Sequence, residues 1–383
     1  MKTKFAAAIA ASAVLCSTVT GASADTLRFA YGHPPGSFFD IGAKAFADAV
    51  DANSEGEVTV RTFPLSLVNL METSDGIASG IADIGALMTT LFPREYPHTN
   101  LAMETAMILL QEDQIGQDMQ GVLYGAAMTD FIVNDCPECN EEFAARNSVF
   151  TAGAASTPYS LNCTAPHVSL ADMKDARVRI AGSYWARWTQ AVGASPVTVS
   201  GNEMLEALSQ GVIDCMLLSV PDVFNFGMGD LVTDITPGLP GGIYVASYAQ
   251  VNRDTWNGLS AQGREALMRA SATGAAEISM KYETGLQDLR AKSEAGEIKA
   301  TFHQPDASLV EATQAFVAKD IKYVVDYYAE TYGVTRGQEM VDALRARVAE
   351  WRGHLDGVTT ADELADLYWN EILSDVDLAS YGQ

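Results

Sequence analysis

Short runs typical of strands alternate with runs typical of helices, and this alternation constrains the fold more than any other feature of the sequence. Residues 26–31, 58–63 and 82–87 have the alternating or apolar pattern of strands. Apolar side chains recur at helical spacing over 39–50, and residues 67–79 have the pattern of a helix. Strands that alternate with helices predict a parallel sheet covered by helices.

The alternation returns in the middle of the chain. We expect strands at 149–152, 158–163 and 176–181, a helix at 183–192, a strand at 196–199, a helix at 203–210 and a strand at 212–218. Long helices then dominate, at 261–292 and 312–330, with a strand-like run at 298–303 between them. The 383 residues exceed what one hydrophobic core usually serves. The sequence therefore predicts an α/β protein of two lobes.

The first 24 residues have the pattern of a secretory signal peptide. Lys2 and Lys4 precede an apolar stretch at 5–16, and the segment ends on small residues up to Ala24. The apolar stretch is shorter than the ~20 residues that a membrane-spanning helix needs, which argues against a membrane anchor. We therefore expect export, cleavage after Ala24 and a periplasmic location. Charge, glycine or proline interrupts every later apolar run, so we do not expect the chain to be embedded in a membrane.

The chain carries 49 acidic against 24 basic residues, which gives a formal net charge of −25. A field of this sign repels nucleic acids, so we expect no nucleic-acid partner. It also repels anionic solutes at long range, and a carboxylate ligand therefore requires positive charge concentrated at its site. An arginine held in a cleft is the side chain that meets this requirement.

Four cysteines follow the predicted cleavage site, namely Cys136, Cys139, Cys163 and Cys215. An even number of cysteines in an exported chain favours disulfides, and four cysteines allow three pairings. We favour the pairs Cys136–Cys139 and Cys163–Cys215. The Cys-Pro-Glu-Cys run is also compatible with a redox-active thiol pair or with half of a zinc site. No second Cys-x-x-Cys run and no histidine cluster completes a metal site, so we expect neither a metal nor another cofactor.

Three stretches of the chain resemble the solute-binding proteins of tripartite ATP-independent periplasmic (TRAP) transporters, the DctP-type family. They are LRFAYGHPPGSFFDIGAKAFADAVDANSEGEVTVRTFP at 27–64, METSDGIASGIADIGAL at 71–87 and ADMKDARVRIAGSYWARWTQAVGASPVTVSGNEMLEALSQGVIDC at 171–215. In the third stretch, a strand with an arginine precedes Gly-Ala-x-Pro and then Glu-x-x-x-Ala-Leu-x-x-Gly-x-x-Asp. The order and spacing of these pieces make the resemblance specific.

The resemblance implies an α/β periplasmic binding protein fold, in which crossing strands join two lobes that close on the ligand like a hinge. It also implies a long helix in the C-terminal region that spans both lobes. It assigns 25–153 plus 247–298 to lobe one and 154–246 plus 299–383 to lobe two. A protein of this family captures a small organic carboxylate and delivers it to the small and large integral membrane subunits of a TRAP transporter.

The resemblance places Arg179 in the cleft between the lobes, as the clamp for the ligand carboxylate. A guanidinium offers its donors in a planar fork that matches a carboxylate, and it stays charged when it is buried. Arg177 lies two residues away and therefore on the same face of the strand. The residue pattern alone does not decide between the two arginines.

Two departures from the family narrow the class of ligand that we expect. Some members have a second arginine on the strand that leads into lobe two, where this chain has no basic residue at 153–157. Some also have an asparagine where this chain has Gly182. A site with one arginine favours a ligand with one carboxylate. The aromatic residues near the clamp strand favour an aromatic or otherwise apolar ligand body.

The other candidate ligand contacts follow the ends of predicted strands, flank the clamp strand or lie near a crossover. They are His33, Arg94, Tyr96, Trp185, Ser219 and Tyr244. Several have an equally simple structural explanation, such as a turn residue for His33 or a helix core face for Trp185.

Two other functional classes compete with TRAP-type solute binding. A binding protein of an ABC importer, or a sensor, can share the fold and the ligand chemistry. A periplasmic hydrolase or oxidoreductase is disfavoured, because the sequence has no Gly-x-Ser-x-Gly, His-Glu-x-x-His, Gly-x-Gly-x-x-Gly or P-loop motif. We therefore expect a binding protein rather than an enzyme.

Overall fold

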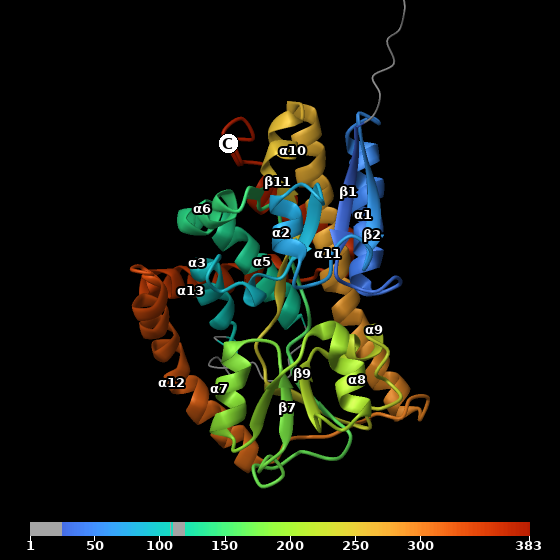
Figure 1. Ribbon diagram of the computed structural model, residues 1–383, viewed down its shortest axis with the longest axis vertical. Coiled ribbons are helices and arrows are strands. Elements are labelled where there is room, and N and C mark those ends of the chain that lie inside the picture. The colour runs from blue at the N-terminus through green and yellow to red at the C-terminus, as the bar shows by residue number, and fades with distance from the viewer. Residues whose placement is uncertain (1–24, 108, 110–118) are drawn as a thin grey trace, which may run out of the picture.

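Two α/β halves are stacked along the long axis of the molecule (Figure 1). The computed structural model describes residues 25–107, 109 and 119–383. The predicted signal peptide at 1–24 lies outside the described residues. No helix in the described part of the chain is long and apolar enough to cross a membrane.

The first sheet has the strand order β2-β1-β3-β11-β4, and β5 also pairs with β11. Its strands are β1 (Asp25–Tyr31), β2 (Val58–Pro64), β3 (Ile84–Leu87), β4 (Ser148–Val149), β5 (Gly153–Ala155) and β11 (Val245–Asn252). β1 is parallel to β2 and β3, as the strand and helix alternation predicts. β11 is antiparallel to β3, β4 and β5, so a late strand of the chain completes a sheet that the N-terminal part begins.

The second sheet has the strand order β12-β10-β6-β9-β7-β8. Its strands are β6 (Ser160–Cys163), β7 (Arg177–Ile180), β8 (Ser195–Thr198), β9 (Cys215–Leu218), β10 (Asp234–Pro240) and β12 (Thr301–Phe302). β7 is parallel to β8 and β9, whereas β6 is antiparallel to β9 and β10. β7 therefore lies between two parallel neighbours, with its carboxyl end beside the carboxyl end of β9.

Two chain connections and one long helix join the halves. Residues 156–159 link β5 to β6, and residues 241–244 link β10 to β11. The two connections run side by side, because the amide of Ser156 donates to the carbonyl of Tyr244 over 2.9 Å. Helix α11 (Ala261–Glu294) contacts β5 and β11 in one half and α9 and β12 in the other, and Figure 1 shows it running along both. The structure confirms the predicted two-lobed α/β fold with crossing strands and a long spanning helix.

Helices cover both sheets. They include α1 (Phe38–Asn53), α2 (Thr73–Ala78), α3 (Pro97–Glu104), α5 (Gln120–Asp130), α6 (Pro137–Ala145), α7 (Ser183–Ala191), α8 (Met204–Ser209), α9 (Val220–Asn225), α10 (Arg253–Gly258), α12 (Ala307–Tyr332), α13 (Gly337–His354) and α14 (Ala361–Tyr368). The helix predicted at 67–79 begins only at Thr73. The Asn69 side chain accepts hydrogen bonds from the amides of Met71 and Glu72 at 2.9 and 3.1 Å, which fixes a turn before the helix.

Small residues allow α1 and α11 to pack closely. A Cβ atom at Gly42 would lie 2.3 Å from Cγ1 of Ile278 and 3.1 Å from the carbonyl oxygen of Gly274, both on α11. The Tyr248 hydroxyl of β11 donates to the carbonyl of Gly42 over 2.7 Å, which ties α1 to the sheet. Helix α11 is thus anchored against the first half before it reaches the second.

The C-terminal helices α13 and α14 pack against α5 and α11. Arg347 of α13 forms ion pairs with Asp130, the last residue of α5, over 3.1 Å, and with Asp135, the last residue of the π-helical turn that follows α5, over 2.7 Å. Trp351 of α13 also donates its indole hydrogen to Asp130 over 2.9 Å. The predicted lobe boundaries stay a prediction.

Both of the disulfides that we favoured are present. Cys136 and Cys139 are joined at the start of α6, and Cys163 and Cys215 join facing positions of β6 and β9. His167 lies close to Cys163 and Cys215. Their disulfide removes both sulfurs as thiolate ligands, so this cluster does not form a metal site.

Candidate ligand-binding cleft

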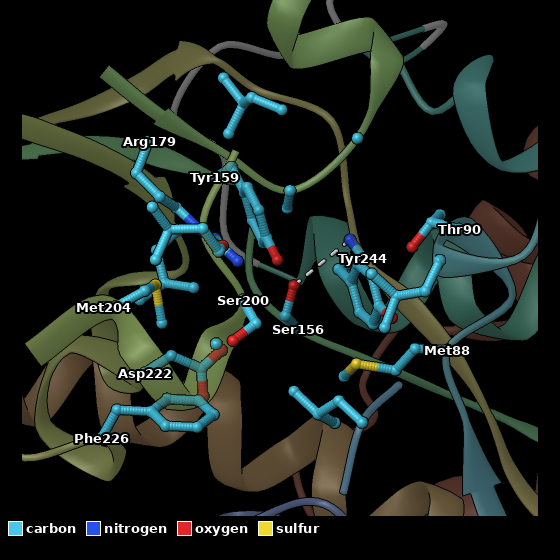
Figure 2. Close-up of a pocket in the computed structure, with 18 of the residues that line it drawn as sticks. Met88, Thr90, Ser156, Tyr159, Arg179, Ser200, Met204, Asp222, Phe226 and Tyr244 are labelled. Carbon is cyan, nitrogen blue, oxygen red and sulfur yellow. Dashed lines mark hydrogen bonds between the residues drawn. The ribbon is translucent and has the colours of Figure 1, made fainter. Parts of the chain in front are cut away.

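A cavity of about 650 Å³ lies between the two halves, with lining residues from both sheets (Figure 2). Much of its wall is apolar or aromatic, including Phe39, Leu70, Met88, Tyr159, Ile180, Val199, Met204, Leu218, Phe226 and Tyr282. A few polar side chains interrupt this wall, including His33, Thr90, Ser156, Arg179, Asp222 and Tyr244. A concave, mostly apolar cavity with a few polar groups is the usual form of a site for a small molecule.

Arg179 is the charged donor of the cavity. It lies near the carboxyl end of β7 and is only 6% exposed. Its Nε donates to the carbonyl of Val199 over 2.9 Å, and its Nη1 donates to the carbonyl of Leu217 on β9 over 3.3 Å. These two bonds fix the plane of the guanidinium and leave part of its donor fork unused. Among the described residues that line the cavity, Arg179 is the only arginine or lysine.

The charge of Arg179 is not neutralised by direct contact. Within the described chain, no carboxylate oxygen comes within 4.0 Å of its guanidinium nitrogens. Burial lowers the pKa of Arg179, and the charge of Asp222 acts in the opposite direction. Because a guanidinium stays protonated even when it is buried, the cavity contains a fixed positive charge.

Arg177 has a different environment, although it lies on the same strand. It is exposed and pairs with Asp214, with 2.9 Å between Nε and Oδ2, and it donates to the carbonyl of Gly211 over 2.6 Å. It does not line the cavity. Of the two arginines between which the residue pattern did not decide, Arg179 is therefore the one at the cavity.

Asp222 is a second charged group of the cavity wall, and it is 7% exposed. It lies in the first turn of α9, and its carboxylate accepts hydrogen bonds from Ser219 over 2.7 Å, Tyr282 over 2.6 Å and Asn225 over 3.0 Å. Burial raises the pKa of Asp222, whereas its hydrogen bonds and the charge of Arg179 act against this rise. The carboxylate is therefore held in one orientation beside the cavity.

Three polar side chains of the wall have no partner for one of their atoms. Nδ1 of His33, Oγ1 of Thr90 and the hydroxyl of Tyr244 are buried and make no hydrogen bond of regular geometry to another described residue, although the Thr90 side chain interacts with the Tyr244 hydroxyl. The His33 ring stacks on Phe39, with 3.9 Å between ring centres, and burial lowers the pKa of His33 to about 3. A neutral imidazole and two hydroxyls therefore face the cavity with unused hydrogen-bonding capacity, which is unusual for buried polar groups.

The structure brings together three of the predicted site residues at this cavity, namely Arg179, His33 and Tyr244. The other four do not line it. Arg94 is exposed, the buried Tyr96 hydroxyl bonds to Ser74 over 2.9 Å, and Trp185 stacks on Tyr159 and donates to the carbonyl of Gly241 over 3.1 Å. Ser219 is buried, and its hydroxyl donates to Asp222, which lines the cavity. Ligand contact by any of these residues stays a prediction.

Asp222, Tyr282 and Phe226 also line the cavity, although they are not among the predicted site residues. Asp222 closely follows a predicted strand, and ligands of α/β sheets bind outside the carboxyl ends of strands, so its position was a usable signal. Tyr282 lies inside the long helix α11 and reaches Asp222 across the fold. No local pattern marks such a residue.

Comparison with known proteins agrees with this architecture. The family model described as bacterial extracellular solute-binding protein, family 7 (DctP) matches residues 29–323. An extracytoplasmic solute receptor of Bordetella pertussis that binds pyroglutamic acid has 20% identity and a TM-score of 0.68, over 84% of this chain and 100% of that one. A TRAP periplasmic solute-binding protein of Bordetella bronchiseptica, with bound (R)- and (S)-mandelate, has 20% identity and a TM-score of 0.70, over 85% and 99% of the two chains.

The periplasmic ectoine-binding protein of a TRAP transporter of Halomonas elongata has 18% identity and a TM-score of 0.68, over 85% of this chain and 100% of that one. At these identities the solved structures show the shared fold, whereas the family model matches most of the sequence. The chain belongs to family 7 of the bacterial extracellular solute-binding proteins, the DctP family of TRAP transporter solute receptors.

Proposed function

We propose that the protein captures a small organic monocarboxylate with an apolar or aromatic body, and that Arg179 clamps the ligand carboxylate. The observation that carries this proposal is the buried guanidinium of Arg179, which faces a mostly apolar cavity and has no carboxylate in direct contact among the described residues. A ligand carboxylate supplies the missing counter-charge, and charge-assisted pairs of this type are strong where water is excluded.

The composition of the wall supports a ligand with one carboxylate. The described lining residues contain no second arginine or lysine, and the crossing segment after β5 presents Ser156 to the cavity. A second carboxylate on the ligand would lose its hydration without gaining a positive partner, which is unfavourable in a buried site. The solved receptors with pyroglutamic acid and mandelate bind acids that have one carboxylate each, which fits the same chemistry.

The position of the cavity supports capture by closure of the two lobes. Contacts between the lobes lie close to the cavity. Asn202 of the second half donates to the carbonyl of Gly32 in the first half over 3.3 Å, and both flank lining residues. A ligand held by Arg179 on one side and by Thr90 or Tyr244 on the other would favour the closed arrangement, because it contacts both lobes only there. Delivery to the small and large integral membrane subunits of a TRAP transporter, after export and cleavage behind Ala24, completes the proposal.

A thermal-shift screen of organic acids on the purified mature chain tests the proposal. The panel contains aliphatic and aromatic monocarboxylates, sugar acids and small dicarboxylates, and each is added in large excess. A ligand present at about a hundred times its Kd adds about 2.7 kcal/mol to the free energy of unfolding. We expect a subset of the monocarboxylates to raise the melting temperature. The proposal is wrong if only dicarboxylates, or no acids at all, have this effect.

A further inference from the structure

The carboxylate of Asp222 lies at the same end of the cavity as the clamp. The Nη1 atom of Arg179 bonds to the carbonyl of Leu217, one residue before the end of β9, and α9 with Asp222 in its first turn starts two residues after that end. Arg179 and Asp222 lie on the same side of the pocket in Figure 2, and Met88, Thr90 and Tyr244 lie on the other. The charge of each acts on the other, although no ion pair joins them. A ligand carboxylate bound by Arg179 therefore lies on the same side of the pocket as Asp222.

The hydrogen bonds of Asp222 leave it one free position. An ionised carboxylate accepts about four hydrogen bonds, two on each oxygen. Oδ1 accepts from Tyr282 and Asn225, and Oδ2 accepts from Ser219 alone. Oδ2 therefore keeps one acceptor position, on a side chain that borders the cavity and is nearly out of reach of solvent.

This arrangement is unfavourable for a plain carboxylate. Two negative groups that share one cationic neighbour repel each other, and the free acceptor position of Oδ2 stays empty and without water when an apolar ligand fills the cavity. A hydrogen-bond donor on the ligand, placed beside its carboxylate, removes both difficulties. The donor occupies Oδ2, and its positive hydrogen lies between the two carboxylates.

We propose that Asp222 accepts a hydrogen bond from a hydroxyl or N–H group on the carbon next to the ligand carboxylate. The site then selects 2-hydroxy acids, or acids with a 2-amino or lactam N–H, over acids without such a donor. This inference rests on the proposed carboxylate clamp at Arg179 and specifies the ligand class for the same cavity. A role of Asp222 as a counter-charge that only positions Arg179 is the alternative, and it predicts no such selection.

Matched pairs of acids separate these two roles, with affinity measured by isothermal titration calorimetry on the mature chain. The pairs are pyroglutamate with 3-oxocyclopentanecarboxylate, 2-hydroxy-4-methylpentanoate with 4-methylpentanoate, and 2-hydroxy-3-phenylpropanoate with 3-phenylpropanoate. The two members of each pair have similar bodies and differ mainly in the donor. We expect the acid with the donor to bind at least about tenfold more tightly in any pair whose body fits the cavity, because a site that bonds a donor rejects the analogue without it.

The Asp222→Asn variant removes the charge and keeps the shape of the side chain. We expect it to lower the ratio of the two affinities to below about threefold, mainly by weakening the acid with the donor. The Asp230→Asn variant is the matched control. Its side chain is 87% exposed and pairs with Lys299 over 2.9 Å, outside the cavity, so the ratio should equal that of the unmodified chain.

Each other outcome has a distinct meaning. If both members of a pair bind the unmodified chain within about threefold of each other, the inference is overturned and the carboxylate clamp survives. The inference also fails, with Asp222 as a counter-charge only, if Asp222→Asn weakens both members equally. If no acid of any pair binds and the screen finds no other monocarboxylate that does, the proposed clamp fails together with the inference. A ratio within about threefold in the unmodified chain overturns the inference even if the Asp222→Asn chain does not fold.

Discussion

Arg187 of α7 donates a hydrogen bond to Glu104 of α3 across the two halves of the protein, with 2.9 Å between Nη1 and Oε2. The same guanidinium makes two bonds of 2.7 Å to Asp320 of α12. Tyr328 of α12 donates to Glu104 over 2.8 Å, and Ser183 bonds to the same carboxylate. The network therefore links the second half to the first beside the cavity. Helix α12 contributes hydrogen bonds to residues of both halves.

We predict that Arg187→Met destabilises the protein strongly. The guanidinium is 17% exposed and the carboxylates of Glu104 and Asp320 are 9% and 4% exposed, so the change leaves two buried negative charges without their cation. Loss of one partner of a buried ion pair typically lowers the free energy of unfolding by about 3–5 kcal/mol. Urea denaturation measures the change. In the control Arg336→Met, which removes a 43% exposed arginine, the loss should stay below about 1 kcal/mol.

We predict that His33 makes the protein less stable in mild acid. Burial lowers the pKa of His33 to about 3 in the folded protein, against about 6.5 for an exposed histidine. Below pH 6.5 the unfolded chain binds a proton that the folded chain does not, so stability falls as the pH drops towards 3. Between pH 7.5 and 5.0 this contributes a loss of about 2 kcal/mol, which His33→Gln should remove. Equal losses in the two proteins, from urea denaturation at both pH values, would contradict the assignment.

The two disulfides should differ in their effect on stability. Cys163 and Cys215 are 52 residues apart, whereas Cys136 and Cys139 are three apart. In the chain-entropy account a bond that closes a longer loop restricts the unfolded state more. We expect the paired serine substitution at Cys163 and Cys215 to cost about 4 kcal/mol, and the same change at Cys136 and Cys139 to cost about 2 kcal/mol. The reverse order in denaturation experiments would show that native-state effects dominate.

The close packing of α1 on α11 predicts that Gly42→Ala is destabilising. The added Cβ would lie 2.3 Å from Cγ1 of Ile278, so one helix or the isoleucine side chain must shift. Overpacking of this kind typically costs about 1–3 kcal/mol. Gly258→Ala is the control, because no described atom outside its own neighbourhood lies within 4 Å of a Cβ at that position. Thermal unfolding of the two variants should therefore give a lower melting temperature for Gly42→Ala only.

The local patterns of the sequence predicted most of the described strands and about half of the described α-helices, but not how distant strands pair. The runs at 26–31 and 58–63 became the parallel strands β1 and β2. Nothing in the run 245–252 indicates that it lies between β3 and β4, because pairing of this kind depends on contacts across more than 100 residues rather than on spacing. The family resemblance supplied the crossing strands that the local patterns lack.

The candidate site was predictable only in part for the same reason. Arg179 and Arg177 are equivalent by spacing, and they differ because Asp214 lies beside Arg177 and the cavity lies beside Arg179. Trp185 has the aromatic character of a ligand contact, yet its ring packs on Tyr159 inside the second half. Side chains of one chemical type thus acquire different roles from tertiary neighbours that the sequence does not place.

The affinity of Arg179→Gln for the tightest-binding acid of the screen tests the central claim most directly. Isothermal titration calorimetry compares it with the unmodified chain and with Arg177→Gln, which removes the same charge from the same strand outside the cavity. Loss of a buried charge-assisted pair predicts that Arg179→Gln weakens binding at least about a hundredfold, whereas Arg177→Gln stays within about threefold of the unmodified chain. An Arg179→Gln chain that folds and binds the acid with unchanged affinity would contradict the carboxylate clamp.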